Sequence, residues 1–178
     1  MKNSIAFVLG NGTSRQAVDL NKLKEHGVVY GCNALYREFT PHHLIAVDPK
    51  MIYEINLAKY EGATYFENPH GWSSGPTAVW LASNMEHETI YLLGFDFKGV
   101  DGSINNVYAG TQNYLDKNAE ETYYGNWENQ IAKVIKDFPQ ITYIRVNNDY
   151  TPEKLSIYSN YKEEDINTFV ERTLYDPA

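Results

Sequence analysis

The chain has 178 residues, a net charge of −8 and a single cysteine. The length fits one domain, and the acidic balance lacks the concentrated basic surface that tight binding to a nucleic-acid backbone requires. Cys32 cannot form an internal disulfide, and its position at the end of an apolar run favours a core residue over a reactive thiol. The sequence shows neither a leader pattern nor about 18 consecutive apolar residues. We therefore expect a cytoplasmic protein without a membrane span.

Short apolar runs alternate with helix-like segments along the chain. The run 5–9 is continuously apolar, which is typical of a parallel strand covered on both faces. Further strands are expected at 28–32, 44–47, 63–66, 89–93 and 141–146. Helical spacing of apolar residues, with capping residues, glycines and prolines at the ends, predicts helices at 13–23, 49–61, 77–85 and 126–138. This alternation predicts an α/β fold, a single-domain Rossmann-like structure whose mostly parallel sheet has about six strands flanked by helices.

The chain divides into a main domain and a short polar tail. We expect residues 1–150 to form a nucleotide-binding Rossmann-like domain and residues 151–178 to form a tail with a helix at 163–174. The aromatic residues of the tail suit packing on this domain or on a second copy, so a homo-oligomer stays open. Segment 99–110 is rich in Gly, Asp, Ser and Asn without a clear period, which predicts a mobile loop that acts as a lid.

Small-residue turns occur where several of the expected strands end. Gly10-Asn11-Gly12-Thr13-Ser14 follows the first strand, Asn33 follows the second, Asp96 follows the fifth, and Ser74-Gly75 precedes a helix. Each turn alone is equally typical of a plain turn or a helix cap. At the carboxyl ends of parallel strands, however, backbone N–H groups and helix N-termini form ligand crevices. The set predicts a site for a nucleotide-like ligand.

The first turn differs from two common phosphate-binding motifs. Arg15 occupies the place of the third glycine of a dinucleotide fingerprint. The turn also lacks the Lys-Ser/Thr pair of a P-loop. NAD enzymes and P-loop nucleotide hydrolases are therefore both disfavoured.

Taken together, the motifs occur in the order seen in bacterial sialyltransferases of glycosyltransferase family 42, which the chain resembles over roughly residues 5–146. The chain is also similar to the related DUF115 proteins, which include motility-associated glycosyltransferases and 6-hydroxymethylpterin pyrophosphokinase-like enzymes. The motifs that carry the resemblance are Gly10-Asn11-Gly12-Thr13-Ser14, Gly31-Cys32-Asn33-Ala34-Leu35-Tyr36, Ser73-Ser74-Gly75 and Ile90-Tyr91-Leu92-Leu93-Gly94-Phe95-Asp96-Phe97.

The resemblance implies a donor site for a nucleotide-activated sugar, CMP- or UDP-linked, with no cofactor or metal. Asp96 would lie beside the ribose, and Lys98 stands where a phosphate-contacting tyrosine is expected, although a lysine serves a phosphate only as a point charge. The residues implied in donor binding are Gly10, Asn11, Gly12, Asn33, Ser74, Gly75, Asp96 and Lys98.

The catalytic base is less readily assigned. Asn126 occupies the position of the family's catalytic histidine, and an amide cannot take up a proton. His70 lies in the loop before the Ser74-Gly75 turn, and Asp48 follows the third strand, so both are candidates for the catalytic role. Asp48 beside Pro49 is also typical of a plain helix cap.

Three functional hypotheses follow. The leading one is a glycosyltransferase that passes a sugar from its nucleotide donor to an unknown hydroxyl acceptor. A second is a noncatalytic module that binds or sequesters a nucleotide. A third is a magnesium-dependent phosphotransferase of the pterin pyrophosphokinase-like type, which would need more crevice carboxylates than Asp48 and Asp96 supply.

Overall fold

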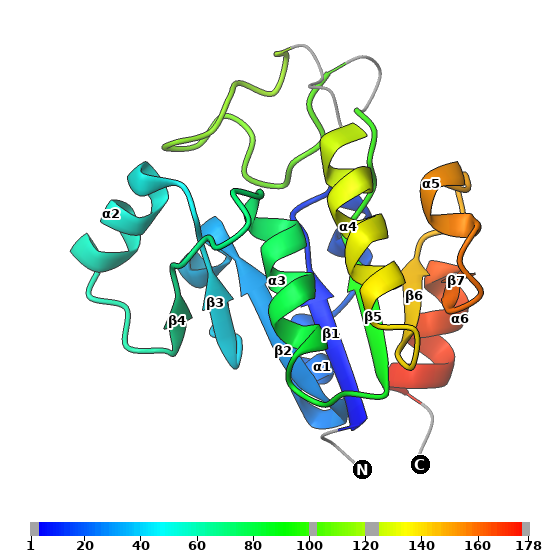
Figure 1. Cartoon of the computed structure of the whole chain (residues 1–178). Helices are drawn as coiled ribbons and strands as arrows, with labels where there is room; N and C mark the ends of the chain where they lie inside the picture. The colour runs from blue at the N-terminus through cyan, green and yellow to red at the C-terminus, as the bar shows by residue number, and fades with distance from the viewer. Residues whose placement is uncertain (1–3, 100–102, 120–124, 176–178) are drawn as a thin grey trace.

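Seven parallel strands form one sheet at the centre of the molecule (Figure 1), which a computed structural model describes for residues 4–99, 103–119 and 125–175. The strands are β1 (Ile5–Leu9), β2 (Val28–Cys32), β3 (His43–Ile45), β4 (Thr64–Tyr65), β5 (Thr89–Leu93), β6 (Thr142–Val146) and β7 (Tyr161–Glu164). Their order is β4-β3-β2-β1-β5-β6-β7, and every neighbouring pair is parallel. The predicted α/β, Rossmann-like fold is confirmed.

Helices cover both faces of the sheet. Because successive residues of a strand point to opposite faces, Ala6 and Val8 pack with the helices at Ser74–Ser83, Gly125–Asp137 and Glu153–Ser156, whereas Phe7 and Leu9 pack with those at Leu20–His26 and Ile166–Phe169. The continuous apolar run of β1 reflects this double burial. The helices are α1 (Leu20–His26), α2 (Pro49–Leu57), α3 (Ser74–Ser83), α4 (Gly125–Asp137), α5 (Glu153–Ser156) and α6 (Ile166–Phe169), with 3-10 turns η2 (Thr13–Ala17) and η3 (Asn33–Arg37) and the π-helical turn η4 (Val170–Leu174).

The seventh strand corrects both the predicted strand number and the helix predicted at 163–174. β7 pairs with the outer edge of β6, where Glu163 lies opposite Arg145. The Tyr161 hydroxyl donates a hydrogen bond to Glu163 at 2.7 Å, and the Arg145 guanidinium lies 3.5 Å from the same carboxylate. Pairing at the sheet edge and a buried cation thus outweigh the helical spacing of the later apolar residues, and the helix begins only at Ile166.

The helix predicted at 13–23 is divided into two pieces. The 3-10 turn η2 ends at Ala17, the chain becomes extended at Val18, and the Asp19 side chain then caps α1 by accepting a hydrogen bond from the Asn21 N–H at 3.0 Å. Contacts with Asp96 hold Ser14 at the start of η2. These long-range contacts favour a tight turn there over a regular helix.

The loop that contains residues 103–119 crosses the carboxyl ends of the strands toward α2 (Figure 1). The Val107 N–H donates to the Asn11 carbonyl oxygen at 2.9 Å, and an Arg37 N–H donates to the Thr111 hydroxyl at 2.8 Å. Residues 100–102 of the predicted lid lie outside the described residues, and its opening stays a prediction. None of the described helices is long and apolar enough to cross a membrane.

Candidate functional site

A cavity of about 260 Å³ lies at the carboxyl end of the sheet, where strand order reverses. β1 has β2 on one side and β5 on the other, so the chain leaves β1 in one direction and later returns to its other side. In open α/β sheets this reversal is where ligands bind. The cavity, here called the switch-point pocket, is lined by Gly10, Asn11, Gly12, Cys32, Asn33, Val47, Asp48, Ser73, Ser74, Gly75, Pro76, Gly94, Phe95, Asp96, Phe97, Lys98, Asn105, Asn106 and Trp127.

The turns after β1 and β5 interlock beneath the pocket. The Gly10 N–H donates to the Leu93 carbonyl oxygen at 2.7 Å, and the Gly12 N–H donates to the Gly94 carbonyl oxygen at 2.9 Å. Gly94 has a φ of 74°, and a Cβ there would lie 2.4 Å from the Gly10 carbonyl oxygen. Glycine is required at Gly94 by both the left-handed backbone and the close approach.

Asp96 is 5% exposed and holds its carboxylate against the first turn. It accepts hydrogen bonds from the Ser14 N–H at 3.1 Å, from the Ser14 hydroxyl, and from the Asn105 amide at 2.9 Å. The Asn105 side-chain oxygen in turn accepts from the Thr13 N–H at 2.7 Å. The N–H groups of Thr13 and Ser14 therefore already donate hydrogen bonds to side-chain oxygens of the protein. They are not available to a ligand, although the sequence predicts that this turn contributes to the ligand crevice.

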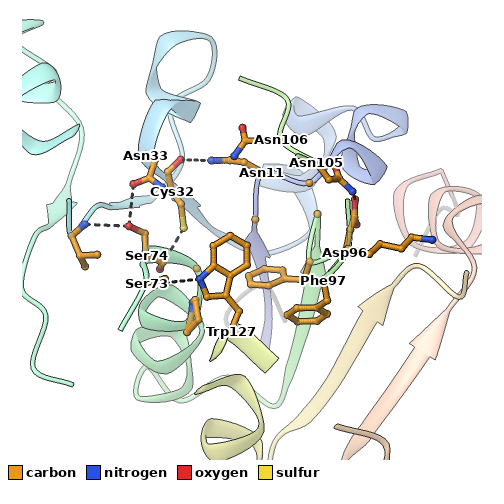
Figure 2. A pocket seen from close by; sticks show the side chains of 18 of the residues that line it. Asn11, Cys32, Asn33, Ser73, Ser74, Asp96, Phe97, Asn105, Asn106 and Trp127 are labelled. Atoms are coloured by element: carbon orange, nitrogen blue, oxygen red, sulfur yellow. Dashed lines mark hydrogen bonds between the residues drawn. The ribbon is translucent and has the colours of Figure 1, made fainter. Parts of the chain in front are cut away.

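A second set of hydrogen bonds joins the turn after β2 to α3 (Figure 2). The Ser74 hydroxyl donates to the Asn33 side-chain oxygen at 3.0 Å and accepts from the Val47 N–H at 3.2 Å. The Asn11 amide donates to the Cys32 carbonyl oxygen at 3.2 Å. Asn33 adopts a φ of 56°, which non-glycine residues seldom adopt outside turns and functional sites. The pocket wall is thus locked by neutral amide and hydroxyl groups.

The N-terminus of α3 opens into the pocket. Its N-cap residue Ser73 makes no side-chain capping bond, and within the described part of the chain the N–H groups of Ser74 and Gly75 donate no hydrogen bond. Such groups, together with the helix dipole, attract anions.

Burial raises the pKa of the neighbouring Cys32 thiol to about 12, so the thiol stays neutral.

All eight residues implied in donor binding line the pocket. Lys98 and the catalytic candidate Asp48, however, already interact with other groups of the protein. Lys98 lines the pocket, yet its ammonium group is paired with the Asp149 carboxylate at 2.5 Å. Asp48 also lines the pocket, is exposed, and caps α2 by accepting from the Lys50 N–H at 2.9 Å. This cap agrees with the plainer interpretation of Asp48 and leaves its chemistry open.

Two positions considered for the base lie outside the set of residues that line the pocket. The His70 ring stacks on Trp72 with centroids 4.3 Å apart and meets Trp80 edge-on at 4.9 Å. Asn126 is an exposed residue of the first turn of α4. Its neighbour Trp127 lines the pocket instead. Because His70 lies outside the lining residues, its placement does not support a catalytic role.

Sequence reasoning missed four residues that shape the site. The Arg15 guanidinium donates to the Gly10 carbonyl oxygen at 3.0 Å, and that of Arg145 donates to the Phe95 carbonyl oxygen at 2.7 Å. Asn105 and Trp127 reach the pocket from the long loop and from α4. A charged residue inside the apolar run of β6 was a readable signal for Arg145, whereas the others sit in ordinary polar or amphipathic patterns.

Comparison of the chain with protein-family models, with curated proteins and with solved structures gave no match. Among the described residues there is also no group of three or more His, Cys, Asp or Glu side chains that could hold a metal ion. A functional assignment therefore depends on the geometry of the pocket and on the resemblance of its motifs.

Proposed function

We propose that the switch-point pocket binds a nucleotide-activated sugar and that the protein transfers the glycosyl group to a hydroxyl acceptor. The observation that carries this proposal is the meeting of three strand-end turns and the open N-terminus of α3 in one cavity at the reversal of strand order. A nucleotide needs such a combination of neutral hydrogen-bonding groups, apolar surface and backbone donors.

Each part of the donor has a matching part of the pocket. The phosphate suits the Ser74 and Gly75 N–H groups at the start of α3. Asp96 suits a ribose hydroxyl, because a carboxylate has about four acceptor positions and three are used within the protein. Asn33 lies beside Ser74 and suits the sugar.

The transfer step needs a base for the acceptor hydroxyl. Asp48 is the exposed carboxylate among the described residues that line the pocket, and we assign it this role. Asp48 would accept the hydroxyl proton as the acceptor oxygen attacks the anomeric carbon. The bond between that carbon and the phosphate oxygen breaks, and the nucleotide leaves with the electron pair.

A noncatalytic nucleotide-binding module is the second candidate, and two observations favour it. The Lys98 ammonium is paired with Asp149, and His70 stacks on Trp72 outside the pocket lining, so neither is placed to assist a leaving phosphate or an acceptor. Such a module would keep the crevice and bind the nucleotide without turnover. The phosphotransferase hypothesis has no comparable support, since Asp48 and Asp96 are the carboxylates that line the pocket among the residues that the structure describes.

Thermal unfolding in the presence of CMP, UDP, GDP, ADP and their sugar conjugates, with and without magnesium, tests the binding. Ligand at about a hundred times its Kd adds roughly 2.7 kcal/mol, which raises the Tm by about 5 to 10 °C in a domain of this size. Asn33→Ala should remove the shift, whereas Asn167→Ala, on the exposed side of α6, should keep it. Absence of any shift in the wild type would contradict nucleotide binding.

Release of free nucleotide from the conjugate that binds then separates the two candidates. Transfer or hydrolysis that is lost in Asp48→Asn and retained in His70→Ala supports the enzyme, because asparagine still caps α2 but accepts no proton. Recovery of intact conjugate after long incubation with the wild type supports the noncatalytic module. Turnover only with magnesium would instead favour the phosphotransferase.

A further inference from the structure

Trp127 presents an aromatic ring to the switch-point pocket from the first turn of α4. Its Nε1–H donates to the Ser73 hydroxyl at 2.6 Å, and Figure 2 shows this polar edge turned toward Ser73. The residue is 37% exposed, and it lines the cavity together with Phe95 and Phe97. The hydrogen bond fixes the edge of the indole while part of the side chain remains accessible at the pocket.

One aromatic residue of the pocket lining, Phe97, has an unfavourable backbone conformation. Phe97 has a φ of 57°, a left-handed conformation that is unfavourable for a bulky residue. Its ring is buried and packs against that of Phe95 with centroids 6.2 Å apart. Strained residues that persist at a cavity point to a ligand-binding role.

The charges around the pocket show which part of a nucleotide can contribute affinity. Its ionisable lining residues within the described chain are Cys32, whose thiol stays neutral, Asp48, Asp96 and Lys98. The Lys98 ammonium is already paired with Asp149, and both aspartates oppose an anion. A phosphate therefore relies on the N–H groups at the start of α3, so the neutral part of the ligand must supply much of the binding energy.

We infer that Trp127 is a base-stacking residue, on which the planar heteroaromatic base of the ligand packs. This inference rests on the proposed nucleotide binding and adds to it the group that recognises the base. Every nucleobase has a π-face, so stacking on an indole supplies affinity without a spare charge. Trp127, Phe95 and Phe97 give the lining of the cavity an aromatic portion against which a planar base can pack.

Calorimetric titration of the full chain with CMP, UMP, AMP and GMP, and with ribose 5-phosphate as the probe that lacks a base, tests the stacking. Trp127→Ala should weaken the monophosphate that binds the wild type best by about 10- to 100-fold. It should leave the affinity for ribose 5-phosphate unchanged. Trp127→Phe, which keeps an aromatic face, should lose less than Trp127→Ala, and Trp72→Phe, at a tryptophan outside the lining, should bind like the wild type.

The possible results distinguish a failure of the stacking role from a failure of the proposed nucleotide binding. Equal weakening of the monophosphate and of ribose 5-phosphate, or no weakening at all, would overturn the stacking role while leaving nucleotide binding intact. A wild-type protein that binds none of the monophosphates would overturn both. If Trp127→Ala does not fold, as judged by circular dichroism, the comparison of Trp127→Leu with Trp127→Phe decides. Both variants lose the hydrogen bond to Ser73, so stacking requires Trp127→Leu, which also loses the aromatic face, to bind the monophosphate more weakly than Trp127→Phe.

Discussion

The turns after β1 and β5 both border the switch-point pocket, and each is held by a buried arginine, but the surroundings of the two cations differ. Arg145 is fully buried and donates to the carbonyl oxygens of Phe95 at 2.7 Å and Asp96 at 3.3 Å. Asp149 and Glu163 face it at 3.3 and 3.5 Å. The turn after β5 is therefore tied to β6 and β7 by a fully buried cation that two carboxylates face.

Arg15 holds the turn after β1 in a more open setting. It is 4% exposed and donates to the Gly10 carbonyl oxygen and to the Tyr108 hydroxyl, which lies on the long loop. Its nearest carboxylate, Glu38, is 3.9 Å away and 55% exposed. The comparison teaches that one side of the pocket depends on the sheet core, whereas the other depends on a loop and on a solvent-screened charge.

Replacing the enclosed cation should give the largest effect. Arg145→Met should lower the free energy of unfolding by about 3 to 5 kcal/mol, because it leaves buried backbone carbonyl oxygens without their donor and removes the buried cation that faces Asp149 and Glu163. Urea unfolding followed by circular dichroism measures this. The matched control is Arg172→Met, whose ion pair with Glu164 is 62% exposed at the arginine and should matter by less than about 1 kcal/mol. Equal effects would contradict a special role for the buried cation.

Replacing Gly94, which lets the turns after β1 and β5 approach each other, should give the second-largest loss of stability. Gly94→Ala places a side chain on a left-handed backbone and within 2.4 Å of the Gly10 carbonyl oxygen, so we expect a loss of about 2 to 4 kcal/mol. Gly71 has a similar φ of 70° but open space around its Cβ position, and Gly71→Ala should lose only about 1 to 2 kcal/mol. Thermal melts of both variants separate backbone strain from the contact between the turns.

Arg15→Met should cost less than Arg145→Met. The loss of its hydrogen bonds to Gly10 and Tyr108 predicts about 1 to 3 kcal/mol. If the loop supports this turn, Tyr108→Phe combined with Arg15→Met should be less than additive, since both remove the same contact. A double-mutant cycle measures this coupling, and strict additivity would argue against it.

The smallest effect concerns acid stability on the β5 side. Burial tends to raise the pKa of Asp149, but its hydrogen bond with Lys98 and the charges of Arg145 and Lys98 outweigh burial and lower that pKa below its ordinary 3.8. A lowered folded-state pKa stabilises the protein above about pH 3.8 and loses this contribution as the pH falls through the folded value. Asp149→Asn should therefore reduce stability near neutral pH, on the order of 0.5 kcal/mol, and flatten its fall in acid. Unchanged profiles in denaturant melts at stepped pH would contradict this.

Much of the candidate site could be anticipated from local signals. The turns Gly10-Asn11-Gly12 and Gly94-Phe95-Asp96 each follow an apolar strand, and parallel strands bring their carboxyl ends to one edge. Ser74 and Gly75 stand at the start of a helix that the following apolar residues predict. What these patterns lack is information on which polar partner each side chain chooses.

The tail shows the same limit for the fold. Its apolar spacing favours a helix at 163–174, and an isolated segment offers no competitor to that periodicity. In the folded protein, the edge of β6 and the buried Arg145 offer residues 161–164 an alternative partner, and these residues pair with β6 as a strand. Secondary structure at such a sheet edge is decided by a partner that is distant in the chain.

The amino-acid sequence by itself determined the parallel α/β architecture and the end of the sheet where the turns gather, because hydrophobic period and turn residues act over a few neighbouring positions. Only the tertiary structure decided that Lys98 turns to Asp149, that His70 stacks on Trp72, and that Trp127 borders the pocket. These outcomes depend on packing and charge pairing between elements far apart in the sequence, which no local pattern encodes.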